Sequence, residues 1–378
     1  MFRFNVTLIL SLVAVLALPL VSVGALPPNC TEYVQPGSPS WTYLICLPDA
    51  NNDTGDLVVY AHGYDAPSAD DPVQIPADQL MLGGTSIPDL VTSLGYAFAA
   101  TSYPKTGLAI KEGVQDVGNL VTFYQTQTGN TPGHVYLAGV SEGGLVATLA
   151  IEQNQSSFSG GLALCAPIGD FPGQINHLDD FRTVFDYFFP GQLPPSPVNI
   201  PPDVIQNWET TYVPSITAAV TAHPLATAQL LSVTDVPVQL GGAADTVIGL
   251  LWYNVFATNQ ARLELGGQPF DNIKWYHGSL NDLRLNLRID RFHADAAARQ
   301  EMKAHYQTSG HLPVPLVTMN NTRDPIVPYW HATLYGWKVL LSGSLGNYFH
   351  VPVLRYGHCN FTPAEVLFGF AVLVVILG

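Results

Sequence analysis

The segment 135–150 constrains the fold of this chain more than any other stretch of its sequence. A short apolar run leads into Gly-Val-Ser-Glu-Gly at 139–143, and a run rich in Ala and Leu follows. This pattern predicts a buried strand, a sharp turn and a helix, with Ser141 in a strained backbone conformation at the turn. Side chains at Gly139 and Gly143 would collide with the neighbouring strand or helix. The segment therefore makes Ser141 a candidate nucleophile, held at the carboxyl end of a sheet.

Strand-like and helix-like patterns alternate on both sides of this segment. Apolar runs predict strands at 41–47, 57–61, 96–101, 161–166, 314–319 and 350–355, and helical patterns lie at 87–94, 111–124 and 330–341. The alternation predicts an α/β fold, a mostly parallel sheet with helices on both faces. Between 171 and 312 it gives way to aromatic-rich helical patterns and Pro-rich loops. We expect a helical cap at 171–312, inserted between two parts of the sheet core, 26–170 and 313–378.

Two later loops carry the groups that a serine nucleophile needs. A serine hydroxyl reacts only when a base takes its proton, and that base needs a partner to fix its tautomer. Asp324 follows the predicted strand 314–319, and His358 follows the last predicted strand. Open α/β sheets place their sites at the carboxyl ends of strands, so we expect Ser141, Asp324 and His358 to meet there. Asp170, after the strand 161–166, is the alternative acid.

Three other histidines receive structural interpretations. We expect His62 to shape the loop after the strand 57–61 and His350 to pack within the fold. We expect His331 at the surface or at a helix cap. Neither zinc-type ligand spacing nor a phosphate or dinucleotide motif is evident in the sequence, so we expect no metal and no cofactor.

These motifs resemble those of the α/β-hydrolase superfamily. The matching pieces are His62-Gly63, the segment 139–143, the segment 324–328 and Gly357-His358. The resemblance covers the chain after residue 25 except the cap, which is the variable part of that fold. It implies that Ser141 is the nucleophile, His358 the general base and acid, and Asp324 the orienting carboxylate.

The resemblance also implies an oxyanion hole made of two backbone N–H groups. One would belong to Glu142 and the other to the loop after His62, where Tyr64 is our assignment. Such donors stabilise the transition state by about 3–4 kcal/mol each. Tyr103, at the end of the predicted strand 96–101, either lines the substrate pocket or fills core.

The four cysteines allow three disulfide pairings. Cys30 and Cys46 bracket a short loop, which favours a bond between them. Cys165 ends a predicted strand near the site, and Cys359 adjoins His358. A bond between these two would tie the base loop to the sheet, as in some secreted feruloyl-esterase and tannase-like hydrolases, which the chain resembles here. Two buried thiols are the alternative.

The ends of the chain and its composition indicate an extracellular protein. Residues 1–25 have the basic start, apolar stretch and small terminal residues of a cleavable signal peptide, with an uncleaved anchor as the alternative. The net charge is −15 and only 11% of residues are charged, which disfavours nucleic acid as a partner. We read the apolar C-terminus as a helix packed on the sheet, so membrane contact beyond the signal peptide is not expected. Glycosylation sequons begin at Asn29, Asn52, Asn154, Asn320 and Asn360.

The sequence therefore predicts a secreted serine esterase or lipase-like hydrolase. Its substrate would be a small-molecule or polymeric ester, with an apolar acyl or aromatic group suggested by the low charge and the aromatic cap. A cap-bearing serine peptidase is the second hypothesis. A non-catalytic binding protein on the same fold is the third.

Overall fold

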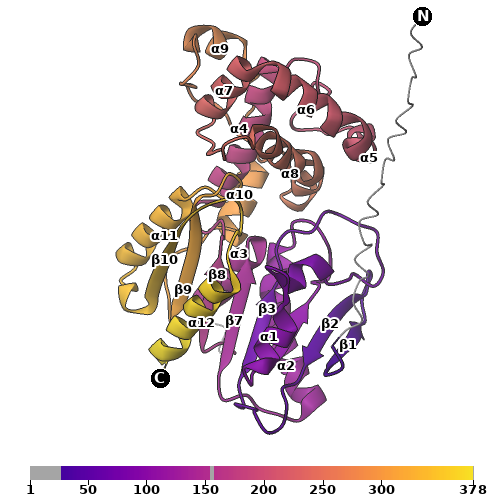
Figure 1. Ribbon diagram of the computed structural model, residues 1–378, viewed down its shortest axis with the longest axis vertical. Coiled ribbons are helices and arrows are strands. Elements are labelled where there is room, and N and C mark those ends of the chain that lie inside the picture. Colours follow the sequence, from indigo (N-terminus) through magenta and orange to yellow (C-terminus); the bar gives the residue numbers. More distant parts are fainter. Residues whose placement is uncertain (1–26, 154–156, 378) are drawn as a thin grey trace, which may run out of the picture.

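The computed structural model describes residues 27–153 and 157–377, and the expected signal peptide lies outside them. Eight strands form one sheet in the order β1-β2-β6-β3-β7-β8-β9-β10 (Figure 1). Strand β2 runs antiparallel to both of its neighbours, and all the other pairs are parallel. The strands are β1 (Cys30–Gln35), β2 (Trp41–Cys46), β3 (Leu57–Ala61), β6 (Ala97–Thr101), β7 (Val135–Val140), β8 (Gly160–Leu164), β9 (Leu316–Arg323) and β10 (Tyr348–Tyr356). The predicted α/β class is confirmed.

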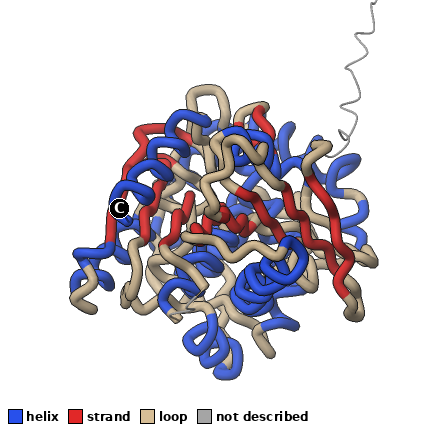
Figure 2. The backbone as a smooth tube through the Cα atoms, turned by 90° about the horizontal axis from the view of Figure 1, so that it is seen from below, coloured by secondary structure: helices blue, strands red, loops and turns tan. Residues whose placement is uncertain are grey.

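Helices cover both faces of the sheet, which explains why its central strands are apolar throughout (Figure 2). All five residues of β3 are buried. Leu57, Val59 and Ala61 pack into one core, and Val58 and Tyr60 pack on the opposite face. Helices α1 (Ile87–Ser93) and α12 (Pro363–Leu377) cover that second face. The first face is covered by α2 (Ile110–Thr128), α3 (Glu142–Glu152), α10 (Ala296–His305) and α11 (Trp330–Leu341).

A second hydrophobic core lies above the carboxyl ends of the strands, in the region expected to form a cap (Figure 1). Its helices are α4 (Phe171–Phe188), α5 (Pro202–Gln206), α6 (Val213–Ala222), α7 (Pro224–Val233), α8 (Ala243–Glu264) and α9 (Asp282–Arg288), with a π-helical turn at Trp208–Tyr212. Ile326 and Val327, which lie far along the chain, belong to this core. Helix α10, also within 171–312, instead buries Ala298 and Met302 in the sheet core.

Local differences from the sequence expectations have identifiable causes. The region 171–312 is expected to be helical, but no sequence pattern locates α6 or α7 within it. Pro214 and Pro224 occupy the first turns of these helices, where proline is tolerated. The edge strand β1 was also not expected, since half of its residues are exposed and its pattern is weak. Strand β9 extends to Arg323, beyond the expected end at 319. Its last residues are polar, so apolar patterning could not reveal them.

The C-terminal helix lies where the sequence predicts it. Gly369 of α12 packs directly on the side chain of Met319, and Leu373 is fully buried against the sheet. Among the described residues, no single helix has both the length and the apolar character needed to cross a membrane, although the sharply bent pair Trp208–Ala222 and Pro224–Val233 passes that test jointly. One expected glycosylation position is excluded, because Asn320 is buried within β9 with 1% of its surface exposed. Asn154 lies outside the described residues.

Candidate active site

Ser141 stands on a strained turn between β7 and α3. Its backbone has φ 55° and ψ −118°, a region that residues with a side chain rarely adopt. The turn is possible only because of its glycines. A Cβ on Gly139 would lie 2.0 Å from the carbonyl oxygen of Gly143, and one on Gly143 would lie 2.0 Å from that of Ala61. The steric role that the sequence assigns to both glycines is confirmed.

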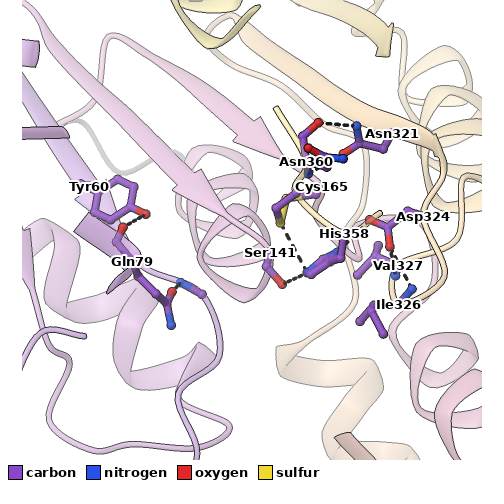
Figure 3. The surroundings of a disulfide bond; sticks show 12 residues. Tyr60, Gln79, Ser141, Cys165, Asn321, Asp324, Ile326, Val327, His358 and Asn360 are labelled. Carbon is purple, nitrogen blue, oxygen red and sulfur yellow. Dashed lines mark hydrogen bonds and ion pairs between the residues drawn. A yellow bond between two sulfur atoms is a disulfide. The ribbon is translucent and has the colours of Figure 1, made fainter. Parts of the chain in front are cut away.

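The structure brings Ser141, His358 and Asp324 into one hydrogen-bonded line (Figure 3). His358 Nε2 lies 2.9 Å from Ser141 Oγ, and its Nδ1 lies 2.7 Å from Asp324 Oδ2. A carboxylate at Nδ1 keeps a proton on that nitrogen and leaves the lone pair of Nε2 facing the serine hydroxyl. The line has the geometry of a nucleophile, a base and an orienting acid.

Backbone and side-chain hydrogen bonds hold the acid loop in place. Asp324 is 2% exposed, and its Oδ1 accepts hydrogen bonds from the backbone N–H groups of Ile326 and Val327. From α4, the Gln174 amide donates to the Ile326 carbonyl, and His177 Nε2 lies 2.8 Å from the Pro325 carbonyl oxygen. Both oxygens of the carboxylate are therefore used, one by the loop and one by the base.

His331 is buried, contrary to its expected place at the surface or at a helix cap. Its Nδ1 accepts from the backbone N–H groups of Gly169 and Asp170, and its Nε2 lies 2.8 Å from Gln174 Oε1. Burial lowers the pKa of His331 well below its ordinary value. A neutral imidazole that donates from Nε2 satisfies all of these contacts. His331 thus links the end of β8 to the helix that holds the acid loop.

The alternative acid, Asp170, lies elsewhere. Its carboxylate accepts from the Gln307 side chain at 3.1 Å, while His358 Nδ1 is paired with Asp324. His350 packs inside the fold as expected, with Nδ1 2.9 Å from Thr318 Oγ1 and Nε2 3.0 Å from the Tyr329 hydroxyl.

A disulfide lies directly against the base. Cys165, just after β8, is bonded to Cys359, and Cys359 Sγ lies 3.4 Å from His358 Nε2 (Figure 3). Both half-cystines have positive φ, 47° for Cys165 and 49° for Cys359. The bond ties the base loop to the sheet. Cys30 is bonded to Cys46, as the sequence favours.

The loop after β3 passes beside the nucleophile. A Cβ on Gly63 would lie 3.3 Å from Ser141 Cβ. The Gly63 N–H is already used, because it donates to Gln79 Oε1 at 2.6 Å. Among the described residues, the N–H groups of Tyr64 and Glu142 donate no hydrogen bond. Both are free backbone donors in segments that lie beside Ser141.

Gln79 is the site residue that sequence reasoning missed. Its side-chain oxygen accepts from the Gly63 N–H, and its side-chain N–H₂ group donates to the Tyr64 carbonyl at 3.1 Å. The backbone carbonyl of Gln79 accepts from the Tyr60 hydroxyl. Figure 3 shows Gln79 and Tyr60 on the side of Ser141 opposite His358. Gln79 lies in a short 3-10 helix, Ala77–Leu80, between two parts of the sheet domain, and no motif marks it, so the sequence offered no signal for this role.

Glu142 has a buried side chain in addition to its backbone N–H beside Ser141. The carboxyl is buried and accepts from the backbone N–H of Ala109, just before α2. Burial raises the pKa of Glu142 to about 8. The side chain points into the fold, while its N–H remains beside the nucleophile.

Tyr103 lies beneath the site, in the core. It is 1% exposed, its ring stacks on His62 at 4.2 Å, and its hydroxyl donates to the His62 carbonyl. Of the two roles that the sequence leaves open, these contacts match the filling of core. They also fit the structural role expected for His62.

Helix α8 of the cap places aromatic side chains against the loop that carries Tyr64. The Tyr64 ring lies edge-on to Trp252 at 6.0 Å and tilted against Tyr253 at 6.1 Å. Trp252 in turn stacks on Phe256 at 5.0 Å. Burial raises the pKa of Tyr253, and the carboxylates of Asp324 and Glu142 add to that effect, so Tyr253 lies within electrostatic reach of the site. The wall of the site on the cap side is therefore aromatic.

No protein-family model and no curated protein matches the sequence. Solved structures of similar fold include an acylaminoacyl peptidase from Pyrococcus horikoshii, with 10% identity and a TM-score of 0.45 over 87% of this chain. The alignment spans 37% of the length of that peptidase. A rice cell wall degrading esterase from Xanthomonas oryzae is 13% identical, with a TM-score of 0.48 over 92% of this chain and 88% of the esterase. Candida antarctica lipase A is 14% identical, with a TM-score of 0.44 over 87% of this chain and 72% of the lipase.

The strand directions and the order of the site residues define the fold of this chain. The sheet has a single strand, β2, that runs against all the others. Its strained serine turn follows β7, and the acid and the histidine follow β9 and β10 in that order. Together these features give the chain the α/β-hydrolase fold.

Proposed function

We propose that this protein is a serine hydrolase that cleaves carboxylic esters through an acyl-enzyme on Ser141. The observation that carries the proposal is the line from Ser141 Oγ to His358 Nε2 at 2.9 Å and from His358 Nδ1 to Asp324 at 2.7 Å, built on a strained turn. Strain is retained in folded proteins mainly where function uses it.

The reaction would run in two steps. Ser141 Oγ attacks the ester carbonyl carbon while His358 Nε2 takes the hydroxyl proton, and that proton then passes to the departing alkoxide. Asp324 stabilises the imidazolium that forms between these events. Water, deprotonated by the same nitrogen, then attacks the acyl carbon; the bond to Ser141 Oγ breaks, Oγ takes the proton back from His358, and the acid leaves. In both steps the negative carbonyl oxygen would lie between the N–H groups of Glu142 and Tyr64.

The aromatic wall supports an apolar or aromatic ester as substrate. Trp252, Tyr253 and Phe256 offer ring faces and edges beside the Tyr64 loop. Apolar groups gain free energy from leaving water on such a surface. A serine peptidase remains the second candidate, since the same chemistry cleaves amides.

We further propose that the protein acts outside the cell. Two disulfides, Cys30–Cys46 and Cys165–Cys359, support an oxidising compartment. Mass spectrometry of protein recovered from the culture medium should give an N-terminus at Leu26. An N-terminus at Met1, or protein retained in the cells, would contradict this proposal.

The deciding experiment uses a fluorophosphonate probe on the purified mature protein and on Ser141→Ala. We expect labelling of the wild type, no labelling of the variant, and turnover of one range of p-nitrophenyl esters between acetate and palmitate. Labelling without ester turnover would favour peptide substrates. A folded wild-type protein that is not labelled would contradict the hydrolase and favour a binding protein.

A further inference from the structure

One side of helix α8 contacts the sheet domain at residues spaced four apart. The Trp252 ring meets the ring of Tyr64, and the Phe256 carbonyl accepts a hydrogen bond from the Tyr64 hydroxyl at 3.2 Å. One turn further, Gln260 Oε1 accepts from the backbone N–H of Leu108 at 2.7 Å. The stripe ends at Glu264, which pairs with Lys105. A spacing of four residues keeps all these contacts on one face of the helix.

The opposite side of α8 is fixed in the cap. Val247, Leu250, Leu251 and Val255 are fully buried in the cap core. Asn254 adds buried hydrogen bonds to the side chains of α4. The helix is therefore part of a rigid cap and is also docked on two loops of the sheet domain.

The two loops are those next to the proposed oxyanion donors. Tyr64 carries one donor N–H itself. Leu108 is followed by Ala109, whose N–H donates to the carboxyl of Glu142, the residue with the second donor. Gly107 also packs against the Gln260 side chain, where a Cβ would lie 2.5 Å from Gln260 Cδ. Contacts of α8 thus reach both sides of the space in which the carbonyl oxygen would lie.

The loop on either side of Tyr64 is held by hydrogen bonds at Gly63 and Asp65, but Tyr64 itself has few polar contacts. On the sheet side, the hydrogen bond that the described residues give Tyr64 comes from Gln79 to its carbonyl. The segment 62–70 has no regular secondary structure. The hydroxyl bond to α8 is consequently the second anchor of this residue, on the side opposite Gln79.

We propose that the Tyr64 hydroxyl and the Gln260 carboxamide are positioning residues, which hold the oxyanion N–H groups in register with Ser141 by fastening their loops to α8. The proposal rests on the proposed hydrolase function. It makes Tyr64 a residue with two tasks: its backbone meets the reacting oxygen, and its side chain sets where that backbone lies.

The first test replaces Tyr64 by Phe, which keeps the ring and removes the hydroxyl donor. Complete loss of an oxyanion donor costs about 100- to 1,000-fold in kcat, and a donor that is only less well placed should cost less. We expect kcat on the best p-nitrophenyl ester to fall about tenfold, with KM changed less than about twofold. A trifluoromethyl ketone forms an adduct with Ser141 that places a charged oxygen in the oxyanion hole. Its affinity should fall by the same factor as kcat/KM.

The matched control is Tyr212→Phe, which removes a cap hydroxyl that donates to Asp203 at 2.9 Å, away from the sheet domain. We expect its kcat and ketone affinity to equal those of the wild type. Gln260→Leu is the second variant, and it should show the same signature as Tyr64→Phe: lower kcat, unchanged KM and weaker ketone binding. Thermal unfolding of each variant shows whether the cap core is intact.

The outcomes separate this proposal from the proposed function. If the wild type is active and both Tyr64→Phe and Gln260→Leu keep its kcat, the positioning role is overturned and the proposed hydrolase function stands. A loss of activity with no matching loss of ketone affinity has the same consequence. A wild-type protein that the fluorophosphonate probe does not label overturns both.

Discussion

At the scale of single residues, contacts decide between the roles that the sequence leaves open. His358 could act with either of two acids on the sequence alone, and its 2.7 Å contact selects Asp324. The chain order of serine, acid and histidine was accessible to sequence reasoning because motifs mark all three. The contributions of Gln79, Gln174 and His331 were not, since they depend on side chains that reach backbone or side-chain groups of other elements, and no motif marks such contacts.

The two candidate acids can be separated by matched amide substitutions. Asp324→Asn offers an N–H₂ group to His358 Nδ1, which favours the wrong tautomer and puts the proton on Nε2. We expect kcat to fall by about 10³–10⁴-fold, with the fold retained. Asp170→Asn should stay within about threefold of wild-type kcat, because its carboxylate contacts Gln307 and not the base. Esterase kinetics that rank the two variants the other way would contradict the assignment.

The glycines of the serine turn give a second comparison. Gly143→Ala would place a methyl group 2.0 Å from the Ala61 carbonyl, so we expect loss of soluble, folded protein or of all fluorophosphonate labelling. Gly336→Ala in α11 is the control, since its nearest atom is 4.0 Å away. It should stabilise the protein by about 0.5–1 kcal/mol, as alanine does in helix interiors. Chemical denaturation of both variants checks this; a stable, active Gly143→Ala would refute the steric argument.

At the level of elements, apolar runs located the strands well because the sheet is covered on both faces. The run 57–61 coincides with β3, and 330–341 coincides with α11. Elements with weak patterning or with proline at their start were missed, as β1, α6 and α7 show. The cap helices could be expected as a group, but their arrangement could not, because it depends on contacts such as those of Ile326 with the cap core.

The disulfide between the end of β8 and the base loop is an element-level restraint. Replacing both Cys165 and Cys359 by Ser should lower the free energy of unfolding by about 2–5 kcal/mol. Because Cys359 Sγ lies 3.4 Å from His358 Nε2, kcat should fall as well. The control removes Cys30 and Cys46, which lie on strands far from the triad; it should cost stability with kcat retained. Equal kcat in both double variants would show that the base loop holds its place without the bond.

For the whole molecule, buried acids determine how stability depends on pH. Burial raises the pKa of Glu142 to about 8, of Asp179 to about 7 and of Asp186 to about 6. Each folded-state pKa lies above the unfolded value near 4, so the folded protein keeps protons that the unfolded chain releases. These three acids therefore contribute stability that is lost as the pH rises toward 8. Burial lowers the pKa values of His62, His177, His331 and His350, which has the opposite effect below about pH 6.5. Stability should therefore fall between about pH 6.5 and pH 8, and flatten above.

Urea denaturation at steps between pH 6.5 and pH 9 measures this trend. Glu142→Gln keeps an oxygen for the Ala109 N–H and cannot ionise. The variant should lose the part of the decline that lies closest to pH 8. A wild-type protein whose stability rises over this range would contradict the assignment of buried, neutral acids.

The shared packing of Ile326 and Val327 limits how this protein can be redesigned. These residues lie two and three positions after Asp324, and α4 holds the same loop through Gln174 and His177. Deleting the cap, or exchanging it for one of different sequence, would expose two core side chains and free the loop that carries Asp324. The cap and the candidate active site are therefore not independent modules in this chain. Altered substrate range is better sought by point changes on the inner face of α8 than by grafting.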